Sequence, residues 1–429
     1  MSLIPCRCPQ CGAELSASPD QKNMKCNYCD TTFLVEETKQ VVNIENLHTD
    51  NVTIVNSTVN ISVHRILRTS LYVLSRIGIC LGVLVLVLLF TAVTLLNIVF
   101  NGPSKEARNV LCMSLLEPSG TKWIPPLFLS QETIDEIRMG AGGDELPTDS
   151  DPGDVSFDTD SILSSNSDEW KDYPDGIRIV EGERVNGATF TAHVMIVRDP
   201  SQVYMATSTE KFSKDIPGLR ITEVIEKEGA IAGINAGAFY DNGTSSPVVG
   251  SVPEGLVIAG GKVVWDKIEM GVPQEGFAGF NQDNVLVVAQ SMTAKRAMEL
   301  GIRDGCCFGP VLIMNGQINE KVYNGNSGFN PRTAIGQRAD GAVIFVCIDG
   351  RQANSLGGTY KDIIDIMVEF GAVNACNLDG GSSSIMLYRD EYGRYGEPGQ
   401  VQMINNYSLL QEQPRKMPNF FMVAPPKEG

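Results

Sequence analysis

The larger, C-terminal part of this 429-residue chain is predicted to adopt an α+β fold built on mixed β-sheets with a few helices. After about residue 177, short strand-like segments outnumber helical ones and do not alternate strictly with them. Two modules of different composition precede this part: a pair of cysteine motifs, and a 24-residue run without a formal charge. The predicted organisation is a cysteine module (1–38), a short β segment (39–70), an apolar helix (77–100), a juxtamembrane and acidic linker (101–176) and a large domain (177–426).

The first module contains two C-x2-C pairs, formed by Cys8 with Cys11 and by Cys26 with Cys29. Each pair makes a knuckle that supplies two thiolates, and four thiolates close the tetrahedral coordination of a zinc ion. We therefore predict a structural zinc ribbon, similar over residues 5–35 to the short ribbons that open many bacterial membrane proteins. Disulfides between the same cysteines are the alternative.

Residues 40–64 alternate β-branched residues with Asn, Thr and Ser. Alternation with period two predicts short strands, arranged as a hairpin or as one or two coils of a small solenoid.

The uncharged run from Ile77 to Phe100 is predicted to cross a lipid bilayer. Its residues rise about 1.5 Å each in a helix, which gives roughly 36 Å, enough for a hydrocarbon core about 30 Å thick. Basic residues are slightly more numerous before the run than after it: Arg65, Arg68 and Arg76 against Lys105 and Arg108. This bias, and the reduced thiols that a zinc ribbon requires, predict a single-pass protein of the cell membrane with a cytoplasmic N-terminus and an extracytoplasmic C-terminal domain.

The linker is predicted to contain one helix, Ser130 to Arg138, with Ser130 or Thr133 as its N-cap. From Asp144 to Asp175 there are eleven acidic residues and a single lysine, mixed with Pro, Gly and Ser. Such a segment buries too little apolar surface to offset its ordering entropy, so we predict a flexible tether. A calcium site in this acidic segment is an alternative, although it lacks the later glutamate of an EF-hand loop. The net charge of −17 argues against nucleic acid as a partner.

In the large domain, two helices are expected at Ile221–Glu228 and Tyr360–Phe370. The expected strands are Phe190–Val197, Gly255–Ile258, Lys262–Trp265, Asn284–Ala289, Val311–Asn315, Ala342–Ile348, Ala375–Leu378 and Ser384–Tyr388. Four polar, glycine-punctuated segments interrupt them, and the key side chains of these segments are Asn235, Arg332, Asp349 and Asp379. Polar groups at strand ends commonly form sites, and a guanidinium suits a phosphate or a carboxylate. The alternative for each segment is an ordinary turn.

The segments also occur in a characteristic order. They are Asn235-Ala-Gly-Ala-Phe239, Gly309-Pro310 with Asn315-Gly316, Asn330-Pro-Arg-Thr-Ala-Ile-Gly336, Asp349-Gly-Arg351 and Asn377-Leu-Asp-Gly-Gly-Ser-Ser383. This series resembles the phosphodiester glycosidase family, which includes N-acetylglucosamine-1-phosphodiester alpha-N-acetylglucosaminidase, over about residues 180–424. Two departures are Ser382, where the family usually has a third glycine, and Arg415-Lys-Met-Pro418 in place of an Arg-Pro-type sequence.

The resemblance implies a site for a sugar-1-phosphodiester. Attack at the anomeric carbon needs a carboxylate, whereas the departing phosphate needs little acid assistance. The catalytic candidates are Asp379 as nucleophile or base, Asp349 as a second acid, and Arg332 as the phosphate-holding group. The substrate-binding candidates are Asn235, Thr333, Arg351, Gly380, Gly381, Ser382 and Ser383. His193 is expected to be structural, and a divalent ion held by carboxylates alone stays open.

The predicted function is therefore that of a membrane-anchored, extracytoplasmic hydrolase of a sugar-1-phosphodiester, N-acetylglucosamine-like, in surface polysaccharide or a glycoconjugate. The alternative is a non-catalytic protein that binds or assembles surface polysaccharide, with its zinc ribbon contacting an unknown cytoplasmic partner. The cysteines after the apolar run are expected to be buried free thiols, with a disulfide as the alternative.

Overall fold

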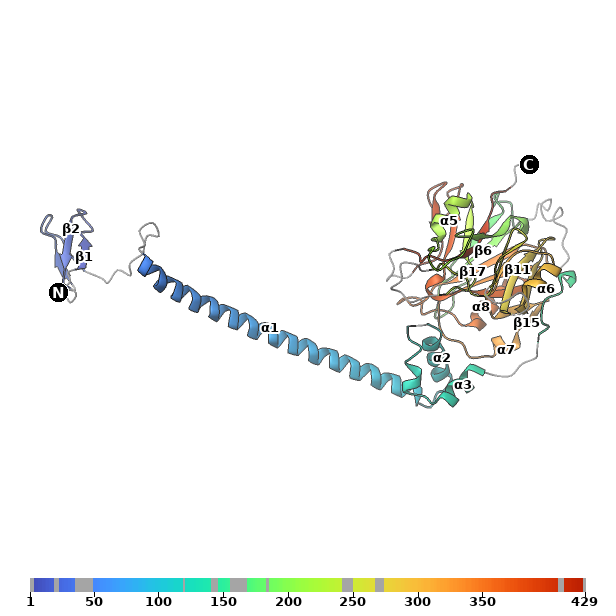
Figure 1. The fold of residues 1–429 in the computed structure, drawn as a ribbon, viewed down its shortest axis with the longest axis horizontal. Helices are drawn as coiled ribbons and strands as arrows, with labels where there is room; N and C mark the ends of the chain where they lie inside the picture. The colour runs from blue at the N-terminus through green and yellow to red at the C-terminus, as the bar shows by residue number, and fades with distance from the viewer. Residues whose placement is uncertain are drawn as a thin grey trace. The chain divides into compact units, whose positions relative to one another are not determined.

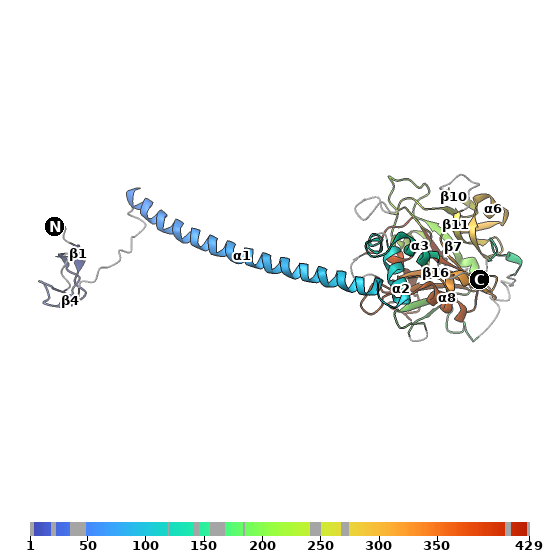
Figure 2. The same ribbon diagram turned by 90° about the horizontal axis from the view of Figure 1, so that it is seen from below.

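The structure is a computed structural model that describes residues 4–18, 23–34, 49–118, 120–139, 146–154, 168–182, 185–240, 250–266, 274–407 and 413–426. The chain divides into two compact units, Met1–Thr91 and Ala92–Gly429. The elements of both units are drawn in Figures 1 and 2.

The N-terminal unit begins with two small antiparallel hairpins, β1 (Ile4–Arg7) with β2 (Glu14–Ala17), and β3 (Asn23–Lys25) with β4 (Thr32–Leu34). The turns have the same construction. Gly12 N–H donates to the Cys8 carbonyl at 2.9 Å, and Asp30 N–H donates to the Cys26 carbonyl at 3.0 Å. Gly12 and Asp30 both have positive φ, at 73° and 60°, which the tight turn requires. Each turn thereby brings two cysteines to the same side.

A single long helix, α1 (Thr49–Phe100), follows these hairpins. The predicted strands in residues 40–64 are wrong from residue 49 onward, and residues 40–48 lie outside the described residues. In the sequence, Val52, Val55, Val59 and Val63 are separated by three, four and four positions, which is a helical spacing as well. The short alternating pattern is therefore ambiguous. Within α1, the stretch Tyr72–Phe100 is long and apolar enough to cross a membrane.

The C-terminal unit contains three β-sheets. A seven-stranded sheet has the order β15-β14-β18-β16-β17-β6-β5. Its strands are β5 (Ile177–Val180), β6 (Ala192–Val197), β14 (Val311–Met314), β15 (Gln317–Ile318), β16 (Arg332–Arg338), β17 (Val343–Ile348) and β18 (Ala372–Leu378).

The other two sheets have five strands each. One has the order β10-β9-β13-β11-β12 and comprises β9 (Leu256–Ala259), β10 (Lys262–Asp266), β11 (Gln274–Asn281), β12 (Leu286–Met292) and β13 (Ile302–Cys306). The other has the order β20-β19-β8-β21-β7 and comprises β7 (Val203–Thr207), β8 (Ala232–Asn235), β19 (Met386–Arg389), β20 (Val401–Met403) and β21 (Asn419–Val423). Sheets with few helices confirm the predicted α+β class.

The three sheets share one core, and helices cover their other faces. On β17, Val343, Phe345 and Cys347 face the shared core, while the alternate residues pack toward α8 (Tyr360–Glu369). Helix α5 (Ile221–Glu228) packs on the sheet that contains β8, and α6 (Ala294–Glu299) on the sheet that contains β11. Short helical segments, η4 (Pro200–Gln202) and α7 (Glu320–Tyr323), complete the connections. Both predicted helices are confirmed to within one residue.

The segment Gly328–Gly336 is a polar interruption by its sequence, but from Arg332 it forms β16, a central strand of the large sheet. Thr333, Ala334 and Gly336 are small residues without the hydrophobicity that marks most buried strands. They are buried because neighbours approach closely: a Cβ added to Gly336 would lie 2.8 Å from the Met367 sulfur. Packing against α8 therefore selects the small residues that make this strand resemble a loop.

The juxtamembrane part of the linker folds into short helices, one of which is predicted from the sequence. Helix α2 (Lys105–Leu116), the turn η2 (Pro125–Leu127) and α3 (Gln131–Met139) form a small cluster with the end of α1. Figures 1 and 2 show α2 and α3 against the β-rich domain. Ser130 caps α3 as predicted, since its Oγ accepts the Thr133 N–H at 3.2 Å.

The prediction of a flexible tether for the acidic segment is wrong where that segment is described, because it is attached to the sheets. A turn that ends in η3 (Pro152–Asp154) follows a stretch in which Ser150 N–H donates to the Val288 carbonyl at 2.9 Å. Trp170 is buried in the core cluster of the large sheet. Backbone pairing and one large buried side chain thus attach this segment to the sheets. Its acidic composition gives no sign of either contact. Residues 155–167, within the predicted tether, lie outside the described residues.

Candidate active site and cysteine cluster

Three of the predicted site residues meet because of the strand register. The strand β16 runs antiparallel to both of its neighbours, β17 and β18. Arg332 at its start pairs with Ile348 at the end of β17, and Thr333 pairs with Leu378 at the end of β18. Arg332, Asp349 and Asp379 therefore lie at one edge of the sheet, although they are far apart in sequence.

A cavity of about 680 Å³ opens at this edge. Its charged lining consists of Asp379, Arg332, Arg351, Arg415, Glu117 and Glu254. Sequence reasoning does not select Glu117 or Glu254, and it marks Arg415 only as a departure from the family pattern. Aromatic side chains, Phe239, Phe308 and Tyr360, complete much of the wall. A cavity of this size with convergent charged groups suits a small polar ligand or one unit of a larger one.

Asp379 is held by its backbone, which leaves its side chain at the cavity. Its N–H donates to the Ala236 carbonyl at 2.9 Å. Its carbonyl accepts hydrogen bonds from Asn235 Nδ2 and from Thr333 Oγ1, the latter at 2.6 Å. Asn235 and Thr333 are fully buried, and the Asn235 Oδ1 is also used, by the Ile385 N–H at 3.1 Å. Asn235 and Thr333 are predicted to bind the substrate. In the structure they are buried and instead fix the backbone of Asp379.

The turn after Asp379 is tightly packed against Pro331. A Cβ added to Gly380 would lie 2.7 Å from the Pro331 carbonyl oxygen, so only glycine fits there. Gly381 has a φ of 62°, and its N–H donates to that same carbonyl at 2.8 Å. Ser382 lines the cavity, whereas Ser383 is buried within the short helix η5 (Gly381–Ser383). The N–H of Gly381, one of the predicted substrate-binding residues, is therefore bonded to the protein itself.

Two guanidinium groups contact the two residues that follow Gly380. Arg351 lies against Gly381, since a Cβ placed there would be 3.2 Å from its Nη2. Arg415 Nη1 donates to the Ser382 Oγ at 3.0 Å. Burial lowers the pKa of Arg351, and the neighbouring charges of Arg332 and Arg415 lower it further, against the opposing effect of Glu117 and Asp379. Positive charge is thus concentrated beside the Asp379 turn, which favours a bound anion.

Arg332 occupies a different position from the one expected of a phosphate-holding group. Its Nε donates to the Gly358 carbonyl at 3.1 Å and its Nη2 to the Gly328 carbonyl at 2.8 Å. Its guanidinium carbon lies 4.1 Å from the centre of the Tyr360 ring. Burial alone would lower the pKa of Arg332, but Tyr360 and the Glu117 carboxylate outweigh it and raise that pKa. The protein itself therefore provides most of the partners of this arginine.

Both carboxylate oxygens of Asp349, the second predicted acid, have partners within the protein. Its Oδ2 lies 3.0 Å from His193 Nε2 and accepts Asn406 Nδ2 at 2.7 Å, and its Oδ1 accepts the Asn406 N–H at 3.0 Å. Burial alone would lower the pKa of His193, but its hydrogen bonds to Asp349 and Glu181 raise it. Asp349 lines a smaller cavity of about 250 Å³, which shares Arg351, Gly381 and Ser382 with the main one. Its contacts fit a structural ion pair.

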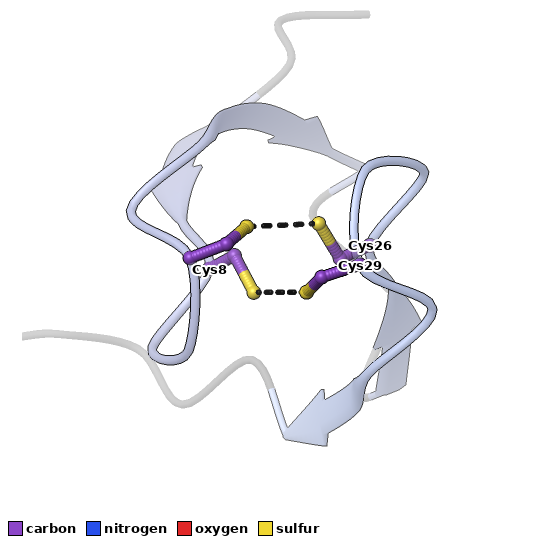
Figure 3. A group of neighbouring side chains, drawn as sticks. Cys8, Cys26 and Cys29 are labelled. Carbon is purple, nitrogen blue, oxygen red and sulfur yellow. Dashed lines mark hydrogen bonds between the residues drawn. The ribbon is translucent and has the colours of Figure 1, made fainter.

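The cysteine cluster forms a second, separate site in the N-terminal unit. The sulfurs of Cys8, Cys11, Cys26 and Cys29 all lie within 4.8 Å of one another. Figure 3 shows the sulfurs of the two knuckles facing each other, with Cys8 and Cys29 at 3.4 Å. A disulfide would need about 2.05 Å, whereas thiolates around one ion at about 2.3 Å lie roughly 3.8 Å apart. The four thiols are therefore arranged to bind a metal ion, and the disulfide alternative does not fit.

The cysteines of the C-terminal unit are free thiols: Cys112, Cys306, Cys307, Cys347 and Cys376. All five are buried, as preferred from the sequence.

The region around the main cavity is similar to proteins of one known family. Residues 228–424 match the family model described as phosphodiester glycosidase. The SPbeta prophage-derived uncharacterized protein YomE of Bacillus subtilis (strain 168) is 26% identical over 199 residues, which is 45% of this chain and 28% of that protein. The chain thus spans less than a third of this relative's length.

Two solved structures are also similar in part. The zebrafish N-acetylglucosamine-1-phosphodiester alpha-N-acetylglucosaminidase catalytic domain, auto-inhibited by its pro-peptide, has 18% identity and a TM-score of 0.42 and covers 58% of this chain and 82% of that one. A hypothetical protein from Synechocystis has 15% identity and a TM-score of 0.38, with 58% and 62% covered.

Proposed function

Because residues 228–424 match the phosphodiester glycosidase family model, we propose that this chain hydrolyses the sugar–phosphate bond of a sugar-1-phosphodiester. One observation supports the proposal most directly: Arg351 lies beside Gly381 and Arg415 donates a hydrogen bond to Ser382, in the turn that follows the cavity-lining Asp379. Two cations and one carboxylate at one turn suit a substrate that has an anionic phosphate next to an electrophilic anomeric carbon.

In this proposal, Arg351 and Arg415 hold the phosphate and stabilise the charge that grows on it as the bond to the sugar breaks. Asp379 acts at the anomeric carbon, either as the base that takes a proton from the attacking water or as the nucleophile that water later displaces. The water oxygen becomes the new sugar hydroxyl. The bridging oxygen leaves with the phosphate, which becomes a monoester and finally carries the second proton of the water.

Hydrolysis in water enriched in a heavy oxygen isotope tests this assignment. We expect the label on the anomeric oxygen of the released sugar when an N-acetylglucosamine-1-phosphodiester is the substrate, because the anomeric carbon is the point of attack. Mass spectrometry of both products gives the answer. A label on the phosphate would contradict the mechanism, and binding without product release would favour a non-catalytic polysaccharide-binding protein.

We further propose that α1 anchors the chain in a lipid bilayer, with the N-terminus cytoplasmic and the glycosidase domain outside the cell. The apolar stretch Tyr72–Phe100 supports the anchor, and the excess of arginines before it supports the orientation. An extracytoplasmic domain would meet N-acetylglucosamine-like phosphodiesters in surface polysaccharide or glycoconjugates. The net charge of −17 supports our expectation that nucleic acid is not a partner.

Zinc is the metal we propose for the cysteine cluster, because four thiolates in two knuckles suit its tetrahedral coordination. Treatment with a zinc chelator should unfold the N-terminal hairpins, since isolated two-stranded hairpins are only marginally stable, and should leave turnover by the glycosidase domain unchanged. Metal analysis and circular dichroism of the N-terminal unit provide the measurement. The Cys8→Ser variant should lose zinc in the same way, whereas Thr32→Ser at a nearby exposed position should keep it. Zinc content unaffected by Cys8→Ser would contradict the assignment.

A further inference from the structure

A glutamate from outside the matched family region enters the main cavity. Glu117 follows α2, and its carboxylate lies 2.9 Å from Arg332 Nη2. The same carboxylate accepts Asn330 Nδ2 at 2.6 Å and the Gly328 N–H at 3.2 Å. Its side chain is 22% exposed and that of Arg332 is 5% exposed. The contact is therefore a largely buried ion pair rather than a surface pair, and the Glu117 carboxylate accepts further hydrogen bonds from Asn330 and Gly328.

The backbone around Glu117 is fixed to the catalytic domain. The Ser114 Oγ accepts the Phe329 N–H at 2.9 Å, and a Cβ added to Gly328 would lie 2.2 Å from the Ser114 nitrogen. Cys112 of α2 is fully buried in a cluster with Phe100, Ile134 and Ile137. Helix α2 is thus held by contacts to the catalytic domain and to this cluster, and the Glu117 carboxylate has a fixed position in the wall of the cavity.

The position of Glu117 bears on which arginines can receive a phosphate. Arg332, Arg351 and Arg415 all line the cavity. A substrate phosphate that approached Arg332 would have to displace a carboxylate that already makes three hydrogen-bonded contacts. Arg351 and Arg415 instead contact the turn beside Asp379. An anion on these two lies close to the carboxylate that we assign to the chemistry, whereas an anion on Arg332 occupies the Glu117 position.

We propose that Glu117 is a positioning residue that determines where the phosphate binds: it occupies the anion-binding face of Arg332 and thereby directs the phosphate to Arg351 and Arg415. This inference rests on the proposed function. It also makes α2, which precedes the matched family region, a structural part of the site.

The Glu117→Gln variant tests the inference in the full-length protein. Glutamine keeps the length of the side chain but removes its charge, so Arg332 should attract a phosphate that no longer faces a carboxylate. Inorganic phosphate should bind at least about tenfold more tightly by calorimetry, which corresponds to about 1.4 kcal/mol. In turnover of a sugar-1-phosphodiester, KM should stay level or fall while kcat falls, because the phosphate is held away from Asp379. A merely structural role would instead weaken phosphate binding.

Two further variants make the test specific. Glu106→Gln removes a charge from the exposed first turn of α2 and should change neither phosphate affinity nor kcat. Glu117→Asp keeps the charge one methylene further from Arg332; it should tighten phosphate binding less than Gln, and it serves as the test if the Gln variant does not fold. Unchanged phosphate affinity in both Glu117 variants would overturn the inference. So would a raised kcat, which would make Glu117 a blocking group.

The two proposals fail in different ways. If the wild-type protein binds phosphate but does not turn over a sugar-1-phosphodiester, the proposed function is wrong, and the comparison of phosphate affinities still decides the role of Glu117. If turnover is present and the Glu117 variants match the wild type, only the inference is wrong.

Discussion

Replacing Asp379 with asparagine should abolish hydrolysis of a sugar-1-phosphodiester while leaving the domain folded. The amide keeps the shape of the side chain but can neither take a proton nor attack a carbon, and losing a general base typically costs about 100-fold to 10,000-fold in rate. Folding should survive because asparagine keeps the size of the side chain, and the backbone hydrogen bonds of Asp379 to Ala236, Asn235 and Thr333 are unchanged. Turnover and the thermal unfolding midpoint are the two measurements.

Asp365→Asn is the matched control for this experiment. Asp365 lies on α8, where it pairs with Lys361 at 2.7 Å and is half-exposed. The same chemical change there should leave turnover within about twofold and stability nearly unchanged, since exposed pairs contribute less than about 1 kcal/mol. Full activity in Asp379→Asn would remove Asp379 from the mechanism.

A chain that begins at Ile177, the boundary predicted from the sequence, should be much less stable than one that begins at Asn101. The shorter chain lacks Trp170, which is buried in the core cluster of the large sheet, and loss of a buried aromatic side chain typically costs about 3–5 kcal/mol. It also lacks Glu117, so the site loses one wall. Urea unfolding and turnover of the two chains provide the comparison.

The chain from Asn101 is itself the control, because it lacks the N-terminal unit and α1 but keeps α2, α3 and both linker attachments. It should match the full-length protein in turnover of a soluble substrate. Equal stability and activity of the chains from Ile177 and Asn101 would mean that residues 101–176 are dispensable, contrary to the contacts described above.

The features that sequence could predict are those set by local chemistry. Two C-x2-C pairs specify a cluster of thiols wherever they fold, and Ser130 caps its helix through a contact three residues away. The meeting of Arg332, Asp349 and Asp379 followed from their positions at strand ends. Their detailed roles did not follow, because these depend on partners from distant segments: Asp349 on His193, and Arg332 on Glu117, which is 215 residues away.

The failures have the same physical origin. The strand β16 lacks a hydrophobic signature because its neighbours require small residues, as at Gly336. The described parts of the acidic linker are ordered by backbone pairing at Ser150 and by one tryptophan, neither of which alters the overall composition. Arg415 did leave a signal, since its segment departs from the family pattern, but only the structure connects that departure to Ser382.

The short connection between α1 and α2 limits where the proposed enzyme can work. Helix α1 ends at Phe100 and α2 begins at Lys105, which leaves residues 101–104 between them. Four extended residues reach at most about 14 Å. With α1 as the membrane anchor of our proposal, the start of α2 would stay within about that distance of the end of the membrane-spanning helix. A domain attached through so short a connection would act at the membrane surface, without the long reach that a flexible tether would give it.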